Sequence, residues 1–377
     1  MKTKTIVLWG TYDTGKPRVR ILLDGLRRTL GDKAVQECHI SVWEHVRDKS
    51  GIGFLQIVGI ILRILLSYPV LAWRYFSLPR HRLVLAAYPG QLDVFPLRVL
   101  AWMKRIPVAL DAFISAYDTV VIDRKLLGQG SIAARIIYAA ERVAYRLPDI
   151  LFTDTREQAR YTELCFRLRR GSVGRVFVGA ETEAFRELSP LQRSRKGHVR
   201  VLFYGQFIPL HGLEVIVGAA GITQQRRPDI RWTIIGEGQL QPAIDAMIEA
   251  DNIKVIERIR WVAYEDLREW IRRSHVCLGI FGTTAKAGRV IPNKVYQILA
   301  TGRPLITADT PAIRELLSPD RNIRLIAPGD PDVLASEVAD VADGVGLNSK
   351  QDSPNLPVGP SQVGNQLVDI LEQLTQC

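Results

Sequence analysis

The sequence predicts an α/β protein made of two doubly wound domains, each with a parallel sheet and helices on both faces. Short apolar segments alternate with helical patterns along the chain, as expected of parallel strands joined by helical crossovers. This alternation stops near residue 187 and restarts at residue 199. A length of 377 residues also fits two domains of ordinary size.

In the first half, the expected strands are apolar runs that end in a turn. Ile6–Trp9 comes first, followed by a glycine-rich turn and an amphipathic helix over residues 19–30. Further strands are expected over 83–88, 107–113, 150–154 and 175–179. A clear helical pattern covers residues 131–146.

The second half repeats this order. Strands are expected over 199–204, 232–235, 253–256, 276–281 and 304–307. Parallel sheets bind ligands outside the carboxyl ends of their strands, so we expect two Rossmann-like domains that face each other across a cleft. The predicted boundaries are an N-terminal domain 1–186, a polar linker 187–198, a C-terminal domain 199–345, and a loop with a closing helix over 346–377.

Composition narrows the class of partner. The chain carries 50 Lys and Arg against 39 Asp and Glu, a formal net charge of +11, which favours anionic ligands or an anionic membrane surface. Its four cysteines are scattered, which argues against a structural metal site or a disulfide framework. The N-terminus has no signal-peptide pattern, so a cytoplasmic location is expected.

Residues 52–78 form an apolar segment long enough to span a bilayer. Arg63 and Arg74 interrupt it, and Pro69 is expected to break or kink a helix. Its polar residues share one narrow helical face at ~100° per residue: Gln56, Arg63, Ser67 and Arg74. This pattern favours a helix that lies at the membrane interface. The alternative is a pair of helices buried in the N-terminal domain.

The glycine-rich turn over residues 10–17 resembles a phosphate-binding P-loop but departs from it at one decisive position. Pro17 stands where that loop needs Ser or Thr to bind Mg²⁺, and proline has no N–H to offer a phosphate. Neither half has a Gly-x-Gly-x-x-Gly motif after its first strand, which argues against a dinucleotide-dependent dehydrogenase.

Three segments of the second half predict a phosphate site. Gly205 follows the first strand, and Gly236 and Gly238 follow the second. The segment Pro292–Lys294 is expected to start a helix that ends at Gly302. A helix N-terminus binds anions, and glycines allow close approach to the backbone. Together the three segments favour a nucleotide phosphate site.

These motifs resemble glycosyltransferase family 4, the retaining glycosyl transferases group 1 with the GT-B fold. The shared pattern is a glycine-rich turn near residues 205–212, then Gly-x-Gly, then Asn-Lys followed by Ala-x-Gly-x-Pro. Residues 178–185 also resemble the segment before that family's interdomain linker. The likeness covers about residues 150–340.

The resemblance implies a donor site, with departures from the family pattern. Gln206 and His211 stand at the family's phosphate-binding Arg and Lys, and Arg289 and Gln297 stand at its paired glutamates. Gln297 is expected to bind ribose hydroxyls, and Arg289 to pair with the diphosphate or an acidic sugar. The implied donor-binding residues are Gly205, Gln206, Gly236, Glu237, Gly238, Lys286, Arg289, Asn293, Lys294 and Gln297.

On the acceptor side, Asp111 and Asp118 follow a predicted buried strand and are candidates to orient the acceptor hydroxyl. A helix or turn cap is the alternative for Asp111. Thr11, Tyr12 and Asp13, at the end of the first strand, are expected to line the same side. With His211 and Lys294 from the donor side, Asp111 and Asp118 complete the predicted catalytic set.

The predicted function is metal-independent, retaining transfer of a hexosyl group from a nucleotide-diphospho-sugar, without a further cofactor. The expected acceptor is a lipid-linked or saccharide precursor of a cell-envelope polysaccharide, at the inner face of the cell membrane. Nucleic acid is not an expected partner. Two alternatives are a nucleotide-sugar epimerase with the same fold and a catalytically inactive, membrane-associated homologue.

Overall fold

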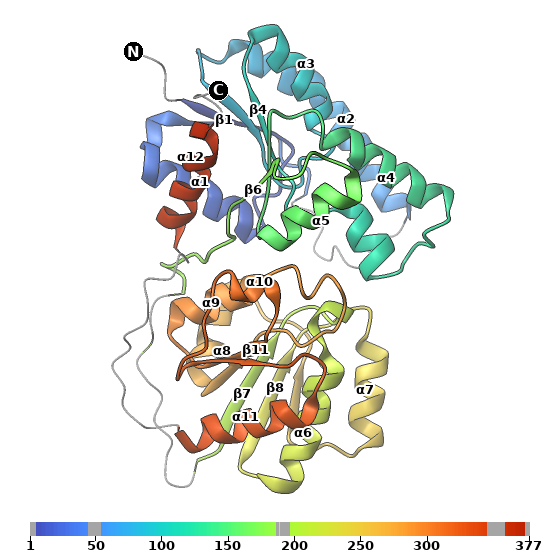
Figure 1. The fold of residues 1–377 in the computed structure, drawn as a ribbon, viewed down its shortest axis with the longest axis vertical. Coiled ribbons are helices and arrows are strands. Elements are labelled where there is room, and N and C mark those ends of the chain that lie inside the picture. Colours follow the sequence, from blue (N-terminus) through green and yellow to red (C-terminus); the bar gives the residue numbers. More distant parts are fainter. Residues whose placement is uncertain (1–4, 44–53, 186–187, 189–196, 345–358, 374–377) are drawn as a thin grey trace. The chain divides into compact units, whose positions relative to one another are not determined.

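The computed structural model describes residues 5–43, 54–185, 188, 197–344 and 359–373. The chain divides into two compact units: unit 1 comprises residues 1–179 and 359–377, and unit 2 comprises residues 180–358. Each holds a six-stranded sheet with helices on both faces (Figure 1). The pairings between strands are all parallel, which confirms the predicted α/β class.

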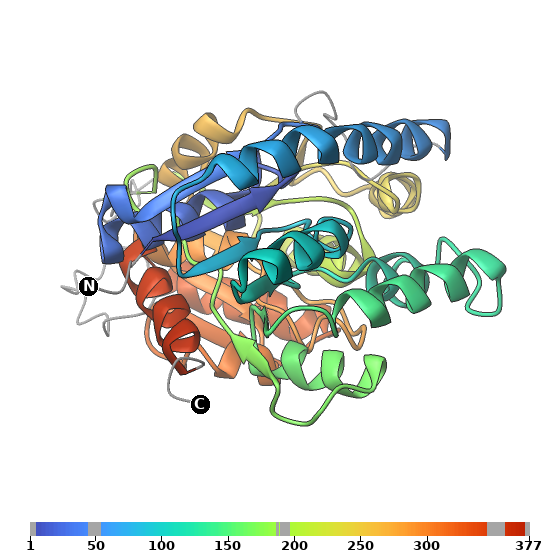
Figure 2. The same cartoon turned by 90° about the horizontal axis from the view of Figure 1, so that it is seen from above.

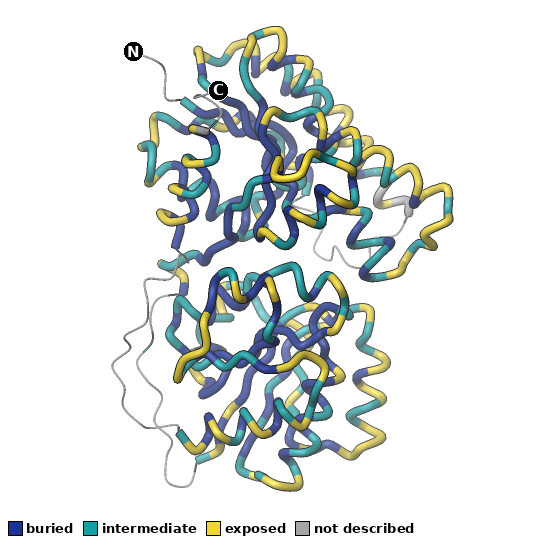
Figure 3. Tube along the Cα trace, in the orientation of Figure 1, coloured by how far each residue is buried: buried dark blue, intermediate teal, exposed yellow. Residues whose placement is uncertain are grey.

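Unit 1 has the strand order β2-β1-β3-β4-β5-β6. The central strands β1 (Ile6–Gly10), β3 (Leu83–Ala86), β4 (Val108–Asp111) and β5 (Ile150–Thr153) are wholly buried. Helices cover both faces of such strands, so they are buried along their whole length (Figure 3) and mostly apolar. The sequence did not predict the edge strand β2 (Val35–His39), which is only partly buried, and β6 (Val173–Arg175) begins two residues earlier than expected.

Six helices pack on this sheet: α1 (Pro17–Leu30), α2 (Phe54–Ser77), α3 (Val94–Lys104), α4 (Ile132–Ala144), α5 (Arg156–Phe166) and α12 (Pro360–Gln373). Pro17 opens α1, because its fixed φ suits a first helical position. The C-terminal helix α12 packs on α1, so it belongs to unit 1 and not to a segment of its own. A Cβ added to Gly364 would lie 2.2 Å from the Gly25 carbonyl oxygen, so only glycine permits this approach.

Unit 2 has the order β12-β11-β10-β7-β8-β9. Its strands are β7 (Val199–Tyr204), β8 (Ile230–Ile235), β9 (Ile256–Ile259), β10 (Val276–Leu278), β11 (Leu305–Ala308) and β12 (Ile323–Ile326). Its helices are α6 (Leu213–Arg226), α7 (Gln241–Ala250), α8 (Leu267–Arg273), α9 (Asn293–Thr301), α10 (Pro311–Arg314) and α11 (Pro331–Gly344). Strand β9 starts later than expected, and the edge strand β12 was not predicted.

The predicted linker 187–198 lies almost entirely outside the described residues, as does the predicted loop from 346 to 358. The first segment of unit 1 ends at Gly179, before the predicted boundary at residue 186.

The apolar segment forms one continuous helix, α2, which runs through Pro69 without ending there. Within the described residues, Val58–Ser77 is the one helical stretch long and apolar enough to cross a membrane. One line of its side chains is nevertheless buried in unit 1: Ile60, Ile64, Ser67, Leu71 and Tyr75. Ser67 was expected to share an outward polar face with the arginines. It is buried, and its hydroxyl donates to the Arg63 carbonyl oxygen at 2.8 Å.

Candidate functional site

Two glycine turns meet at the carboxyl edge of the unit 2 sheet. Gly205 follows β7 with φ +148°, and Gly236 follows β8 with φ +139°. A Cβ added to Gly236 would lie 1.9 Å from the Gly205 carbonyl oxygen. The two backbones therefore touch, which requires glycine at Gly236 for both space and conformation. Gly238, with φ +151°, continues the second turn, and the exposed Glu237 lies between them.

Lys294 is a buried cation beside these turns. It is the second residue of α9, and its Nζ atom lies 3.7 Å from the centroid of the Phe203 ring. A Cβ on Gly205 would lie 2.8 Å from the same Nζ atom. Among the described residues, Nζ has no hydrogen-bond partner. Burial lowers the pKa of Lys294 well below its ordinary value, because the charged form is desolvated.

A buried amine without a partner at a helix N-terminus is costly to charge unless an anionic ligand pairs with it. Native proteins satisfy nearly all their buried polar groups, so an exception calls for an explanation. The first turn of α9 adds backbone N–H groups and the positive end of the helix dipole. An anion bound between Gly205 and the start of α9 would satisfy both features.

His211 lies in the same turn as Gly205. It ends the 3-10 helix η3 (Pro209–His211), and its Nδ1 atom donates to the Gln206 carbonyl oxygen. Its Cε1 atom lies 3.0 Å from the position of a Cβ on Gly205. The structure thus brings His211 and Lys294 together around Gly205, as predicted for the donor side. The Gln206 side chain, which follows Gly205 directly, is exposed.

Gln297 belongs to a chain of buried and partly buried hydrogen bonds. Its Oε1 atom accepts from the Tyr204 hydroxyl at 3.0 Å, and its Nε2 atom donates to the Tyr264 hydroxyl at 3.2 Å. Tyr264 in turn donates to Glu181 Oε2 at 2.5 Å. Gln297 was expected to bind a ribose directly. The observed bonds instead connect it to Tyr264 and to the segment at the start of unit 2.

The other predicted donor residues lie along the segment that leads into α9. Lys286 and Arg289 are half-buried in one turn, where the Arg289 N–H donates to the Lys286 carbonyl oxygen at 2.9 Å. Asn293 is the first residue of α9 and is also half-buried. This segment therefore places additional positive charge on the approach to Lys294.

Asp111 does not face an open site. It is fully buried and forms a two-point ion pair with the fully buried Arg18: Nε to Oδ2 at 2.9 Å and Nη2 to Oδ1 at 3.0 Å. Arg18 Nη1 also donates to the carbonyl oxygens of Val176 and Phe177. The expected role of orienting an acceptor hydroxyl is therefore corrected: Asp111 joins α1, β4 and the segment after β6.

The turn after β1 is held by a residue that the sequence did not single out. Asp93 Oδ2 accepts from the Thr11 N–H at 2.6 Å, and Oδ1 accepts from the Thr11 hydroxyl at 3.0 Å and the Tyr68 hydroxyl at 3.2 Å. Burial raises the pKa of Asp93 to about 6, although these bonds oppose the shift. Thr11 is thus tied to α2 through Tyr68.

Tyr12 and Asp13 complete this turn and are buried with it. The Tyr12 hydroxyl donates to Glu37 Oε2 at 2.8 Å, and Asp13 Oδ1 accepts from the Gly15 N–H at 3.1 Å. The three residues predicted to line the acceptor side are therefore adjacent, but their polar groups make bonds within unit 1.

A second carboxylate that the sequence did not reveal holds the loop after β4. Glu141 of α4 accepts from the Ser115 hydroxyl at 2.6 Å and from the N–H groups of Ala116 and Tyr117 at 2.7 and 3.0 Å. Burial raises its pKa, opposed by these bonds. Asp118 is buried at the end of this loop, where its N–H donates to Ser115 Oγ at 3.0 Å. The described residues contain no cluster of His, Cys, Asp and Glu able to hold a metal ion.

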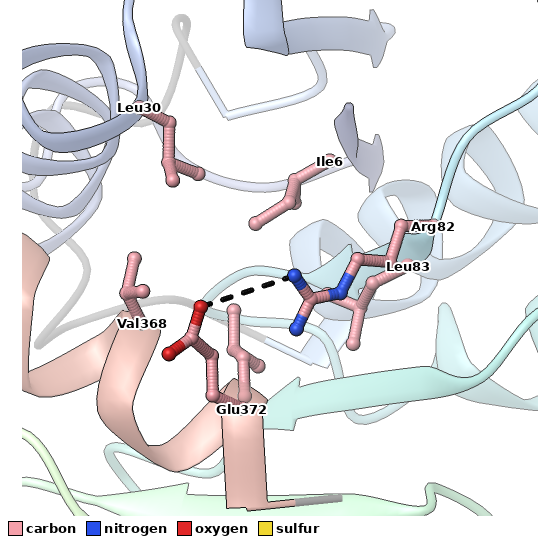
Figure 4. A pocket seen from close by; sticks show the side chains of 7 residues that line it. Ile6, Leu30, Arg82, Leu83, Val368 and Glu372 are labelled. Carbon is pink, nitrogen blue, oxygen red and sulfur yellow. Dashed lines mark ion pairs between the residues drawn. The ribbon is translucent and has the colours of Figure 1, made fainter. Parts of the chain in front are cut away.

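A small hollow lies at the opposite edge of the unit 1 sheet (Figure 4). Ile6 and Leu83, at the starts of β1 and β3, line it with Leu30 and Val368, and Arg82 and Glu372 approach to 4.0 Å beside it. Because it lies at the amino ends of the strands, it is separate from the carboxyl edge where such sheets bind ligands.

Comparison with known proteins agrees with this arrangement. Residues 198–343 match the family model for glycosyl transferases group 1. The structure is similar to that of the sucrose-phosphate synthase of Thermosynechococcus elongatus, with a TM-score of 0.63 and 13% identity. This match covers 99% of the present chain and 97% of the synthase. It also resembles Anabaena HepE in complex with UDP-glucose, with a TM-score of 0.60, 12% identity and 99% coverage of both chains.

The chain has the GT-B fold. Among curated proteins, it is 25% identical over 239 residues to the D-inositol 3-phosphate glycosyltransferase of Streptomyces avermitilis. That alignment covers 58% of this chain and 49% of the relative, so the chain spans about half the length of this relative. In this GT-B chain, the family match falls on unit 2, the unit that carries Lys294.

Proposed function

We propose that this GT-B protein is a glycosyltransferase that takes its sugar from a nucleotide-diphospho-sugar bound by unit 2. The observation that carries the proposal is Lys294, a buried cation without a hydrogen-bond partner among the described residues, between a glycine turn and a helix N-terminus. A diphosphate supplies the negative charge that this position lacks. The match of residues 198–343 to glycosyl transferases group 1 supports the same class of donor.

In this proposal the chain's own cations stabilise the departing diphosphate. Lys294 binds it at the start of α9, and Lys286 and Arg289 add positive charge along the approach. Negative charge develops on the leaving group as the glycosidic bond breaks, so fixed cations lower the barrier without a bound metal. Net retention of anomeric configuration follows from the resemblance to family 4 and not from any distance in the structure.

The proposed acceptor is a lipid-linked or saccharide precursor of a cell-envelope polysaccharide. The outward face of α2 supports a location at the cytoplasmic face of the membrane, because it exposes large apolar side chains, including Leu66 (68% exposed) and Trp73 (71%). Arg63 and Arg74 lie along one edge of this face, where lipid phosphates would meet them. The buried line of α2 fixes the helix to unit 1, which favours contact with the bilayer surface over a transmembrane span.

A thermal-shift screen of nucleoside diphosphates and their sugars tests donor binding first, since a ligand that binds only the native state raises its melting temperature. The best donor is then incubated with and without a panel of lipid-linked and free saccharides. A glycosyltransferase releases nucleoside diphosphate faster when the acceptor is present and forms a glycosylated product.

The same assay separates the other classes. An epimerase converts the donor into an isomeric nucleotide sugar without any acceptor, and an inactive homologue binds the donor without turnover. No thermal shift with any nucleotide sugar would refute the proposed donor class.

A further inference from the structure

Helix α4 exposes an apolar face. Ile132 is 77% exposed and Ile136 63%, and Val143 is also exposed. These positions are spaced by four and seven residues, so they share the side of α4 opposite the buried Ala134 and Glu141. Ala139 and Ala140, both exposed, fill the space between them. An amphipathic helix normally buries its apolar side, whereas α4 presents that side to its surroundings.

Arginines border this face on one side. At ~100° per residue, Arg135 and Arg142 fall together beside the apolar side chains. The only acidic residue of α4, Glu141, points inward and is used by the loop after β4. The outward surface of α4 is thus apolar and positively charged, with no negative group of its own.

Helix α2 has the same organisation. Its outward apolar side chains lie opposite its buried line, Arg63 and Arg74 lie at one edge, and it contains no acidic residue. Figures 1 and 2 show α2 and α4 extending toward the same side of unit 1. On α3, Trp102 and Met103 are exposed as well.

We propose that α4 is a second docking helix, which binds the surface of an anionic lipid bilayer together with α2. This inference rests on the membrane location in the proposed function and extends it to a surface that the sequence pattern had not indicated. The bilayer is the occupant because arginines border both apolar faces, which complements lipid phosphates beside acyl chains.

The inward faces of both helices explain what docking achieves. On α4, Glu141 holds the loop over Ser115–Tyr117, and on α2, Tyr68 holds the turn at Thr11 through Asp93. These loops follow β4 and β1, at the carboxyl edge of the sheet. Docking therefore fixes the loops nearest the expected acceptor relative to the lipid surface.

The test is co-sedimentation of the full chain with vesicles of 70% phosphatidylcholine and 30% phosphatidylglycerol at low salt. We expect the triple variant Ile132→Ser, Ile136→Ser and Val143→Ser to bind at least about tenfold more weakly, since three apolar side chains leave the acyl boundary. The variant Arg135→Glu with Arg142→Glu should lose at least about tenfold at low salt and less at high salt, because exposed charges are screened.

Leu164→Ser is the matched control. Leu164 lies on α5 of the same unit and is 81% exposed, so its replacement removes an exposed apolar side chain from another helix. We expect it to bind vesicles as the wild type does, and all variants to keep the wild-type circular dichroism spectrum. The proposal would be overturned if the α4 triple variant bound vesicles as strongly as the wild type. It would also be overturned if the wild type were a dimer and the triple variant a monomer, because α4 would then be a contact between two copies.

The donor screen separates this proposal from the proposed function. If the protein binds a nucleotide sugar but stays in the supernatant with vesicles, the proposed donor site stands and the docking proposal is contradicted. Protein that sediments through α4 but binds no nucleotide sugar retains docking and contradicts the transferase.

Discussion

At the carboxyl edge of the unit 1 sheet, buried charged side chains are paired with groups of the same unit, whereas at the same edge of unit 2 one buried cation is not. In unit 1, Arg18 pairs with Asp111, and Asp93 and Glu141 each accept several hydrogen bonds. In unit 2, the Lys294 Nζ atom lies over the Phe203 and Tyr204 rings and has no hydrogen-bond partner among the described residues. Two similar sheets thus use this edge differently.

The difference indicates how each unit meets its ligand. In unit 1 these buried charges already have partners, and the exposed apolar surface lies on the outer helices α2 and α4. In unit 2, the buried amine of Lys294 can either lose its proton or pair with an anion, so we expect unit 2 to bind a small anionic ligand.

The largest expected effect breaks the pairing in unit 1. Arg18→Met leaves the Asp111 carboxylate buried without its cation, and we expect unit 1 to lose about 3–5 kcal/mol of its free energy of unfolding. Urea denaturation measures this loss. Arg98→Met, which removes an exposed pair with Asp149, is the control and should cost under about 1 kcal/mol. A similar small loss for Arg18→Met would mean that the buried pair is not what holds this edge.

The second-largest expected effect concerns the contact between Gly236 and the Gly205 carbonyl oxygen in unit 2. Gly236→Ala places a Cβ against the Gly205 carbonyl oxygen at a backbone angle that disfavours alanine, and we expect a loss of about 2–4 kcal/mol in stability. Nucleotide affinity should fall as well, because the two turns must separate. Gly128→Ala, which meets nothing within 4 Å, should leave both quantities unchanged. Equal behaviour of the two variants would show that the close backbone contact is unimportant.

The arginines of α2 probe the outer surface of unit 1. Replacing Arg63 and Arg74 with Glu should weaken binding to anionic vesicles by at least ~2 kcal/mol, about 1 for each basic residue removed. Added salt should reduce wild-type binding toward the level of the variant. A wild type that ignores anionic vesicles at low salt would favour a soluble acceptor. Arg74 also donates to the His39 carbonyl oxygen at 3.2 Å, so the circular dichroism spectrum must be checked.

A smaller effect concerns Lys294 in the absence of ligand. Its pKa is lowered in the folded state, so the unfolded chain binds more protons between that pKa and the ordinary lysine value. Lys294 therefore destabilises the free protein most at low pH, and this cost fades as the pH rises through the lowered pKa toward the ordinary one. We expect Lys294→Met to be more stable than the wild type, with a difference that shrinks toward alkaline pH. A difference independent of pH would show that the amine binds its proton equally in the folded and unfolded states, so that folding does not lower its pKa.

The sequence predicted the buried central strands best, because full burial makes them continuous apolar runs. The strands β1 and β7 were placed almost to the residue. The edge strands β2 and β12 were missed because each has polar or half-exposed positions that interrupt the apolar run. The predicted helix start at Pro292–Lys294 and its end at Gly302 agree with α9, since both depend on local backbone preferences.

The sequence alone could not predict the roles of residues whose partners lie far away along the chain. Asp111 looked like a residue at the end of a strand facing ligand, but its partner Arg18 is far away in sequence and on another element. Asp93 and Glu141 belong to no local motif, and their importance lies in which loop each holds. The position of Lys294 at a helix start beside a glycine turn was predictable, because both features form a recognisable sequence pattern, whereas its role in donor binding stays a prediction.

Calorimetric titration of the best nucleoside diphosphate from the screen into wild type and Lys294→Met tests the central claim most directly. We predict that the variant binds about 1.5–3 kcal/mol more weakly, the range for a charge-assisted hydrogen bond. If the titration is repeated in buffers of different ionisation enthalpy, above the lowered pKa, the wild type should take up protons on binding, because the anion restores the charged amine, and its affinity should fall as the pH rises. The variant should lack the Lys294 part of that uptake. Equal affinities and equal proton uptake in the two proteins would contradict the assignment of Lys294 as the residue that binds the donor diphosphate.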